Sequence, residues 1–470
     1  MRINKTYIIS CATALLSLGL MGCGDDYPSA QEAPYATDLL SIKILNAGPD
    51  GTEVVEGTVD EANRIINFPR IDPATDFSAL RVEASVSEGS ALEETVYNFS
   101  MDEADAFKTL VVRVKNHNRY KDYFMKVRKR IPVYGADFDQ PTLYNFSGDH
   151  LYADYRSLLT RCGDFDGQHV LVVSRATKPH LLKVSDLKQG KIAPIMLDLT
   201  DVSGGTYAYN MGALANGHVY LATLSGAKAS PLKIYYWDTP TSKPEVLANI
   251  KVADIPDAAN RHGDNMSLNI DKNGNGFIFF GDNTSSKILR LTVSNHKTIG
   301  SPVVFPSDGN AGLPMTVFRV GDTSEYIWSG LRLPVTLTDE SVSPKYTMVK
   351  GSTVAEGVAA RVFTFNNSRY LMMCPAAHGS TSKAIPGIYV YDISKGATVE
   401  EALANFDKAD DHNPVYTFYL GGSGNGAGIA QTNYYIEKGP DGKDMKLYLF
   451  ASRADSGFAF AEFPIKKSED

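Results

Sequence analysis

The feature that most constrains the fold of this chain is a loose repeat that fills the sequence beyond Pro132. Each copy contains an apolar strand, a turn with Gly, Asn or Asp, a second strand, and a third strand that ends near Asp. The clearest copies have their turns at Gly167, Gly217 and Asn275, so the unit recurs at intervals of about 50 to 60 residues. A unit of this size buries its faces only against its neighbours. The pattern therefore predicts an all-β propeller with six, alternatively seven, blades over residues 132–470.

Two segments bear on the closure of the ring and on the number of blades. The strand-like run Thr142–Phe146 precedes the first copy, and we expect it to pair with the last blade. The final interval is the longest and contains a helix, Thr398–Phe406, with Thr398 as N-cap and acidic residues in the first turn. The rest of that interval leaves room for a seventh blade.

Residues 38–131 have a different pattern of short β-type runs punctuated by Gly and Pro. Alternation is clear in Arg81–Val86, where apolar and polar side chains fall on opposite faces of a strand. About seven short strands in a segment of this length are typical of an immunoglobulin-like β-sandwich. Residues 23–37 contain two prolines and few aliphatic side chains, so they are expected to form a flexible tether.

Residues 1–22 have the layout of a secretory signal peptide. Arg2 and Lys5 precede an apolar run from Tyr7 to Leu20 that is too short to span a membrane. The stretch Leu20–Cys23, with a small residue directly before the cysteine, resembles the lipobox of bacterial lipoproteins. The resemblance implies cleavage before Cys23, acylation of Cys23, and a membrane-anchored mature chain.

Asp25 and Asp26 follow at once and resemble the short export signal of Bacteroidetes lipoproteins that face the cell exterior. The layout of lipobox, tether, immunoglobulin-like module and divergent propeller is similar to that of Bacteroidetes surface lipoproteins of glycan-capture and uptake systems. The resemblance implies an outer-membrane protein that binds oligo- or polysaccharide without cleaving it. It also implies outer-membrane uptake proteins as further partners.

Charge and cysteine content narrow the possible partners. The chain carries a formal charge of −8, which becomes −10 when the two basic residues of the signal peptide are lost. Nucleic acid is therefore not expected as a partner, and a neutral or weakly cationic ligand fits better.

Cys162 and Cys374 are the two cysteines left for the folded part, and they lie in different copies of the repeat. We expect two buried free thiols because a disulfide needs closely spaced Cα atoms.

The segments that enter the innermost strands of a propeller line its axial funnel, and ligand-binding side chains are sought there. Tyr rings stack on sugar rings, whereas Asn, Asp and Arg bind hydroxyl groups. The alternative is that these polar residues satisfy one another and water. The candidate ligand-binding residues are Tyr155, Arg156, Tyr207, Tyr209, Asn210, Arg261, His262, Asp264, Asn265, Trp328, Arg332, Glu356 and Asn425.

Two other functions stay open on the sequence. A propeller glycoside hydrolase or polysaccharide lyase would need paired carboxylates, for which Asp154, Asp264 and Glu356 are the candidates. A protein-interaction scaffold for an uptake complex would present an exposed apolar patch instead. The sequence carries no recognisable nucleophile, cofactor or metal-ligand motif, so no catalytic residue, cofactor or metal is assigned.

Overall fold

The computed structural model describes residues 35–102, 105, 107–131, 133–150, 152, 155, 160–226, 230–258, 261–281, 286–306, 314–379, 382–421, 429–454 and 456–467. These residues form two compact units, one within residues 35–131 and the other within residues 133–467. The signal peptide and Cys23 lie outside the described residues. Within the described part of the chain, no helix is both long and apolar enough to pass through a membrane.

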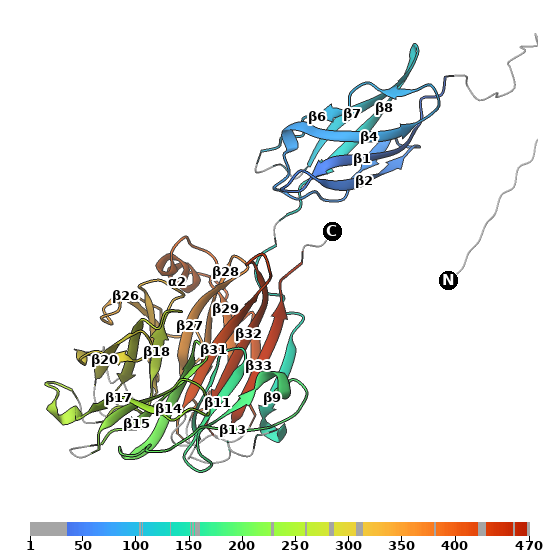
Figure 1. Cartoon of the computed structure of the whole chain (residues 1–470). Helices are drawn as coiled ribbons and strands as arrows, with labels where there is room; N and C mark the ends of the chain where they lie inside the picture. The colour runs from blue at the N-terminus through green and yellow to red at the C-terminus, as the bar shows by residue number, and fades with distance from the viewer. Residues whose placement is uncertain are drawn as a thin grey trace, which may run out of the picture. The chain divides into compact units, whose positions relative to one another are not determined.

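The first unit is all-β, and its described residues form eight strands in the order β5-β7-β8-β3-β2-β1-β4-β6 (Figure 1). Neighbouring strands are antiparallel except β3 and β8. Inward-facing apolar side chains, among them Ile44, Val114 and Tyr123, form one core. The immunoglobulin-like sandwich stays a prediction. The elements are β1 (Leu39–Ala47), β2 (Glu53–Asp60), β3 (Ile65–Asn67), a 3-10 turn (Phe77–Ala79), β4 (Leu80–Val86), β5 (Ala91–Leu92), β6 (Val96–Tyr97), β7 (Phe107–Asn116) and β8 (Arg119–Arg128).

The second unit consists of six antiparallel sheets, each made largely of strands that are consecutive in sequence. Blades 1 and 2 contain β10 (Thr160–Phe165), β11 (His169–Ser174), β12 (His180–Lys183), β13 (Ile195–Met196), β14 (Tyr207–Ala215), β15 (His218–Leu224), β16 (Leu232–Trp237) and β17 (Glu245–Ile250). Blade 3 contains β18 (Ser267–Ile270), β19 (Gly276–Gly281), β20 (Lys287–Ser294), β21 (Thr298–Ile299) and β22 (Val303–Pro306). Blade 4 contains β23 (Met315–Arg319), β24 (Tyr326–Gly330), β25 (Thr336–Thr338) and β26 (Pro344–Thr347).

Blades 5 and 6 complete the unit. Blade 5 contains β27 (Gly357–Phe365), β28 (Ser368–Pro375), β29 (Gly387–Asp392) and β30 (Tyr416–Tyr419). Blade 6 contains β31 (Ala430–Lys438), β32 (Asp444–Arg453), β33 (Gly457–Pro464) and β9 (Thr142–Ser147). Among the described residues, α-helices are found at α1 (Val184–Leu187) and α2 (Val399–Asp407), and 3-10 turns at Gly148–His150 and Val252–Asp254.

The six sheets are arranged as a β-propeller. Their first strands, β10, β14, β18, β23, β27 and β31, each contact the next in this order, and β31 contacts β10 again. These inner strands therefore form a closed ring around the axis, which confirms six as the number of blades. The longest interval of the repeat owes its length to the stretch between β28 and β31. The described residues of this stretch form β29, α2 and β30, and both strands belong to blade 5. Thr398 caps α2 in a capping box with Glu401, as expected from the sequence.

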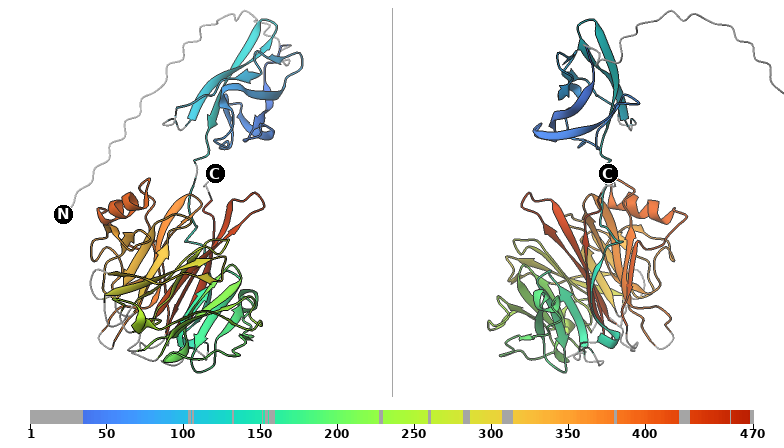
Figure 2. Two further views of the ribbon diagram at one scale, coloured as in Figure 1. Left: turned by 60° about the vertical axis from the view of Figure 1, so that its left-hand side comes forward. Right: turned by 90° about the vertical axis from the view of Figure 1, so that its right-hand side faces the viewer.

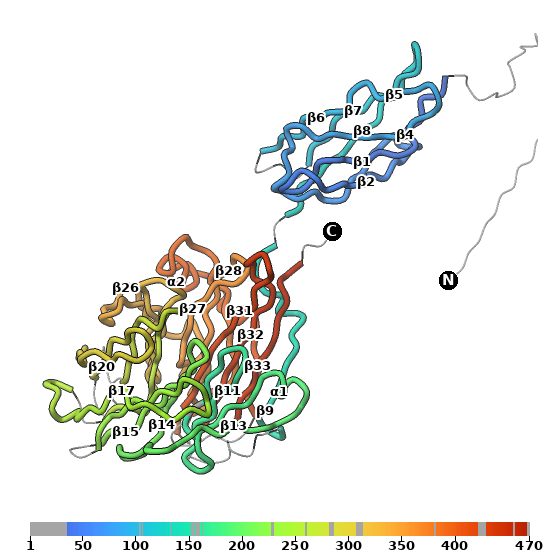
Figure 3. The backbone as a smooth tube through the Cα atoms, in the orientation of Figure 1, coloured from blue at the N-terminus to red at the C-terminus, as the bar shows by residue number. Residues whose placement is uncertain are grey.

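The ring is closed by a strand from the start of the unit. β9 pairs with β33 from Thr142, opposite Glu462, to Ser147, opposite Gly457, and this confirms the expected role of the segment. β9 (teal) runs beside β33 (red) although nearly the whole unit separates them in sequence (Figures 1 and 2). The tube in Figure 3 follows the chain from β9 through the blades and back to β33.

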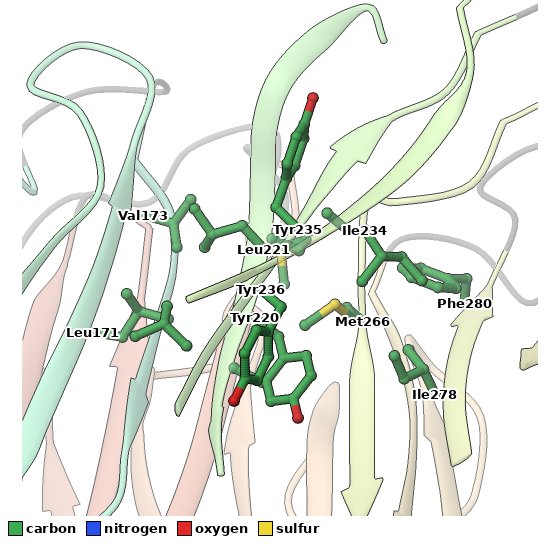
Figure 4. Packing of buried hydrophobic residues seen from close by; sticks show 14 of the residues in the cluster. Leu171, Val173, Tyr220, Leu221, Ile234, Tyr235, Tyr236, Met266, Ile278 and Phe280 are labelled. Atoms are coloured by element: carbon green, nitrogen blue, oxygen red, sulfur yellow. The ribbon is translucent and has the colours of Figure 1, made fainter. Parts of the chain in front are cut away.

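Neighbouring blades are held together by large apolar side chains. Figure 4 shows Leu171 and Val173 of blade 1, Leu221 and Ile234 of blade 2, and Phe280 of blade 3 packed within one cluster. Burial of such side chains contributes about 1.5–3 kcal/mol each, so every sheet depends on the two sheets beside it. Cys374 is a buried free thiol in the core of blades 5 and 6, and burial raises its pKa to about 12.

Removal of an aromatic side chain from the closing blade tests the role of this closure. The Phe458 ring is fully buried and stacks on Phe146 of β9 with 4.9 Å between ring centroids. We expect Phe458→Ala to lower the free energy of unfolding by about 3–5 kcal/mol in denaturant titrations, because it leaves a cavity at the closure. Tyr419→Ala, at a ring that is 55% exposed on β30, is the control and costs about 0.5 kcal/mol or less. Equal losses in the two variants would contradict the prediction.

Candidate functional site

A connected set of polar side chains lies where the inner strands of blades 1 to 3 begin. Its charged centre is Asp264, in the segment that enters β18, and the carboxylate is fully buried. Arg161 of β10 lies with Nη2 3.1 Å from Oδ1 of Asp264, and Arg261 lies with Nε 2.9 Å from Oδ2. The Arg161 side chain is buried, whereas the Arg261 side chain is 41% exposed. Asp264 thus joins an internal guanidinium to one that solvent can reach.

A third guanidinium belongs to the same network. Arg175 directly follows β11, and its guanidinium lies 3.5 Å from the ring centroid of Tyr207 on β14. Its Nη2 donates a hydrogen bond to Oδ1 of Asn210, whose Nδ2 donates to the backbone oxygen of Gly263 over 2.6 Å. Tyr207 remains 41% exposed. We call this set the entry network, and its members are Arg161, Arg175, Tyr207, Asn210, Arg261 and Asp264.

The charges of the entry network affect the acidity of Arg175. Burial lowers the pKa of Arg175 to about 10, and repulsion from the positive charges of Arg161 and Arg261 acts in the same direction. Asp264 and the Tyr207 ring oppose this shift. The three arginines are therefore close enough to repel one another, and an added negative charge in the network would be stabilised.

Glu356 and Arg332 meet at the segment that enters β27. Arg332 Nε lies 3.1 Å from Oε1 of Glu356, while the Ser382 hydroxyl and the His378 backbone N–H donate to Oε2 over 2.6 and 3.1 Å. Burial alone would raise the pKa of Glu356, but the hydrogen bonds from Ser382 and Arg332 outweigh it and hold the pKa below its ordinary value. Glu356 and Arg332 both have positive φ, at 57° and 62°, so side-chain positions here are maintained at some cost in backbone strain.

Two predicted aromatic ligand residues are instead core residues. Trp328 is only 4% exposed and packs between blades 3 and 4 with Phe279, Met315 and Val342. Tyr155 is fully buried against Phe458. Because neither ring is exposed, the expectation that they stack on a ligand is corrected to a packing role.

The other predicted residues divide into four groups. Tyr207, Asn210, Arg261 and Asp264 come together in the entry network, and Arg332 and Glu356 form a separate pair. Tyr209 is half-buried against the core of blades 1 to 3, Asn265 accepts a hydrogen bond from Gly281 N over 2.9 Å, and buried His262 bonds Ser225 through its backbone. Arg156, Asn425 and Asp154 lie outside the described residues, as does the side chain of Cys162.

Arg161 and Arg175 are not among the residues predicted from the sequence, and neither is a further group of buried polar residues in the propeller. Asp164 of β10 accepts hydrogen bonds from Leu214 N and from Asn433 Nδ2 over 2.7 and 2.8 Å, and burial raises its pKa. Arg361 of β27 supplies nearby positive charge and lies 3.4 Å over the ring of Phe318. Arg161, Asp164 and Arg361 lie inside strands, where the sequence offers no signal that separates them from solvent-facing positions. Among the described residues, no group of His, Cys, Asp and Glu side chains could hold a metal ion.

The contacts of Glu356 predict that the stability of the fold depends on pH. The pKa of Glu356 is lower in the folded chain than its ordinary value of 4.5, so its carboxylate stabilises the fold above that value. This stabilisation is lost as the pH falls through the folded pKa. We expect Glu356→Gln to lower the free energy of unfolding by about 1–3 kcal/mol at pH 7, and this difference from the wild type to shrink below pH 4.5. Denaturant titrations across pH measure both effects. Glu340→Gln, at an exposed position, is the control, and a difference independent of pH would contradict the assignment.

Comparisons with known proteins place the chain in a family. The model of a family described as "Domain of unknown function (DUF4623)" matches residues 25–466. The crystal structure of a DUF4623 family protein from Bacteroides eggerthii DSM 20697 is 61% identical, with a TM-score of 0.76 over 92% of this chain and 99% of that chain. No curated protein matches the chain.

Two distant solved structures show weaker similarity. BamB from Moraxella catarrhalis has 9% identity and a TM-score of 0.31, over 66% of this chain and 84% of its own. A glucose dehydrogenase has 13% identity and a TM-score of 0.34, over 68% of this chain and 99% of its own. Neither likeness supports a conclusion about function. Because the family model spans nearly the whole chain and the Bacteroides eggerthii protein is 61% identical to it, this protein belongs to the DUF4623 family.

Proposed function

We propose that this protein binds carbohydrate without cleaving it, through the entry network of the propeller. The observation that carries the proposal is the exposure of Tyr207 and of the Arg261 side chain, each 41% exposed, within one set of polar residues joined by ion pairs, hydrogen bonds and a ring contact. An aromatic ring can pack on the apolar face of a sugar, while guanidinium and amide groups bind its hydroxyl groups. Arg175 and Asn210 hold this surface in place before a ligand arrives, which lowers the entropic cost of binding.

Two of the candidate catalytic carboxylates, Asp264 and Glu356, lie in the described part of the chain, and their contacts favour binding over hydrolysis. Both oxygens of Asp264 lie within 3.1 Å of a guanidinium nitrogen. The pKa of Glu356 is lowered, whereas the general acid of a glycosidase needs a raised pKa. Glu356 is therefore not suited to donate a proton to a glycosidic oxygen, and both oxygens of Asp264 are already occupied by ion pairs.

Loss of the exposed aromatic ring tests the carbohydrate site. We expect Tyr207→Ala to raise the Kd for an oligosaccharide at least about tenfold, or about 1.4 kcal/mol, in calorimetry on the chain that starts at Gly24. Ligands are chosen from an array of neutral and acidic polysaccharides, with product analysis on the same samples. Tyr419→Ala, which removes an exposed ring from outer strand β30, keeps wild-type affinity. Saturable binding that survives Tyr207→Ala would move the site elsewhere, and shorter products would favour the hydrolase or lyase.

We also propose that Cys23 is acylated and anchors the protein to the outer membrane, facing the cell exterior. The lipobox-like stretch ending at Cys23 and the acidic pair Asp25 and Asp26 support this location. Residues 38–131 would then serve as an immunoglobulin-like spacer next to the membrane, consistent with their eight strands and single apolar core.

The anchor is tested by labelling with a palmitate analogue. We expect Cys23→Ser to abolish the label and to move the protein out of the membrane fraction, because no thiol remains at the acylation position. Asp25→Asn combined with Asp26→Asn should keep the label but remove access of external protease to intact cells. A Cys23→Ser protein that stays labelled in the membrane fraction would contradict the anchor.

A protein-interaction scaffold remains a second candidate because of one surface of the first unit. Val111 on β7 pairs directly with Phe124 on β8, and both side chains are about half exposed, as is Phe107 on the same strand as Val111. Exposed apolar side chains grouped on one sheet face favour contact with another protein. A scaffold of this kind would bind none of the glycans in the titration.

A further inference from the structure

We propose that the sugar bound at the entry network carries an anionic group, a carboxylate or a sulfate, and that Arg175 and Arg261 bind this group. The inference rests on the proposed function and names the ligand class of the same site. Three guanidiniums lie in the network, and Asp264 is the one carboxylate that the described residues contribute to it.

Arg175 provides the clearest reason for an external anion. Within the described structure it forms no ion pair with any carboxylate, and its polar contacts are to Asn210 and to the face of Tyr207. One terminal nitrogen, Nη2, is occupied by Asn210, and the buried Nε has no hydrogen-bond partner among the described residues. A guanidinium presents its donors in a planar fork that matches the oxygens of carboxylate and sulfate. Arg175 is thus a positive group held in a fixed position without a negative partner of its own.

Arg261 supplies the second half of the proposed anion site. Its Nε is engaged by Asp264, yet the side chain is 41% exposed, so the outer guanidinium nitrogens are available from solvent. Arg175 is connected to Arg261 through Asn210, which bonds the backbone of Gly263, and through Asp264, which follows Gly263 and pairs with Arg261. The positive charge of Arg261 also lowers the pKa of Arg175, so the two charges repel each other. An anion between them would relieve this repulsion in a partly buried place where charge interactions are stronger than in bulk water.

The fixed orientation of the two side chains gives specificity as well as attraction. Asn210 bonds both Arg175 and the backbone of Gly263, which directly precedes Asp264, so the positions of the two guanidiniums are linked through the protein. Tyr207 lies against the guanidinium of Arg175 and is 41% exposed, so it offers an apolar surface on which a sugar ring can pack. A ring that carries its charge at one edge can contact Tyr207 and the arginines together.

The test uses matched charged and neutral ligands. Calorimetry on the chain from Gly24 compares trigalacturonic acid with its methyl ester, and a sulfated galactan tetrasaccharide with its desulfated form. We expect the charged member of at least one pair to bind about tenfold or more tightly than its neutral partner, and this advantage to fall as NaCl is raised from 50 to 300 mM. The pair that shows the advantage tells whether carboxylate or sulfate is the preferred group.

Arginine substitutions then show which residues cause the preference for the charged ligand. Arg175→Gln and Arg261→Gln each remove most of the preference for the charged ligand, whereas Arg319→Gln, a half-buried arginine at the far end of inner strand β23, leaves it unchanged. Arg261→Gln changes an exposed side chain and keeps the test valid if Arg175→Gln fails to fold. Tyr207→Ala weakens charged and neutral ligands alike.

A second measurement separates failure of this inference from failure of the proposed function. Sodium sulfate, compared with sodium chloride at equal ionic strength, raises the Tm of the wild type more than that of the Arg175→Gln, Arg261→Gln double variant. Equal binding of charged and neutral sugars, or a preference that survives both arginine changes, overturns the anion site and leaves carbohydrate binding intact. A variant-dependent sulfate effect without sugar binding keeps the anion site and overturns the carbohydrate. Equal sulfate effects in the two proteins and no sugar binding overturn both.

Discussion

The pairing of β9 with β33 is the interaction on which the rest of the propeller depends. Each blade buries its faces against two neighbours, so an open ring would leave the first and last blades each with an exposed apolar face. The strand from residues 142–147 joins the last sheet and gives blade 6 its fourth strand, while aromatic pairs such as Phe146 and Phe458 fill the space beside it. Closure also fixes β31 against β10, and thereby the position of Arg161, which begins the entry network.

The buried charges within the ring serve position more than stability. Desolvation of Asp264 and of Arg161 costs several kcal/mol, and such pairs seldom repay more than that cost. We infer that the pair fixes how blades 1 and 3 are arranged, because both groups are satisfied only when Arg161 and Asp264 meet. Backbone strain at Arg332 and Glu356, which both have positive φ, persists because the surrounding contacts determine the conformation. The hydrogen bonds and the ion pair of the Glu356 carboxylate offset that local cost.

The propeller could be predicted from the sequence because its signals are local and repeated. Strand, turn and strand recur at an interval that matches one blade, and Thr398 and Glu401 mark the N-terminus of α2. The site could be predicted only in part. Alternation tells that Trp328 lies in a strand, but it does not tell whether the ring faces a neighbouring blade or solvent, and the ring proved to be buried. Arg175 was not predicted because it follows the second strand of a blade. Ligand-binding residues were expected only in the segments that enter the first strands.

The net charge of the chain and the proposed anion site favour different ligands, and the difference has a physical reason. A formal charge of −8 spread over 470 residues argues against an anionic partner when only the average is considered. In physiological salt, however, charges farther apart than about 8 Å are largely screened, so a ligand responds mainly to the groups it touches. At the entry network these groups include Arg175 and Arg261, and the nearest described carboxylate, Asp264, is already engaged by two guanidiniums. The proposed anionic ligand therefore depends on the local excess of positive charge among these residues and not on the average charge of the chain.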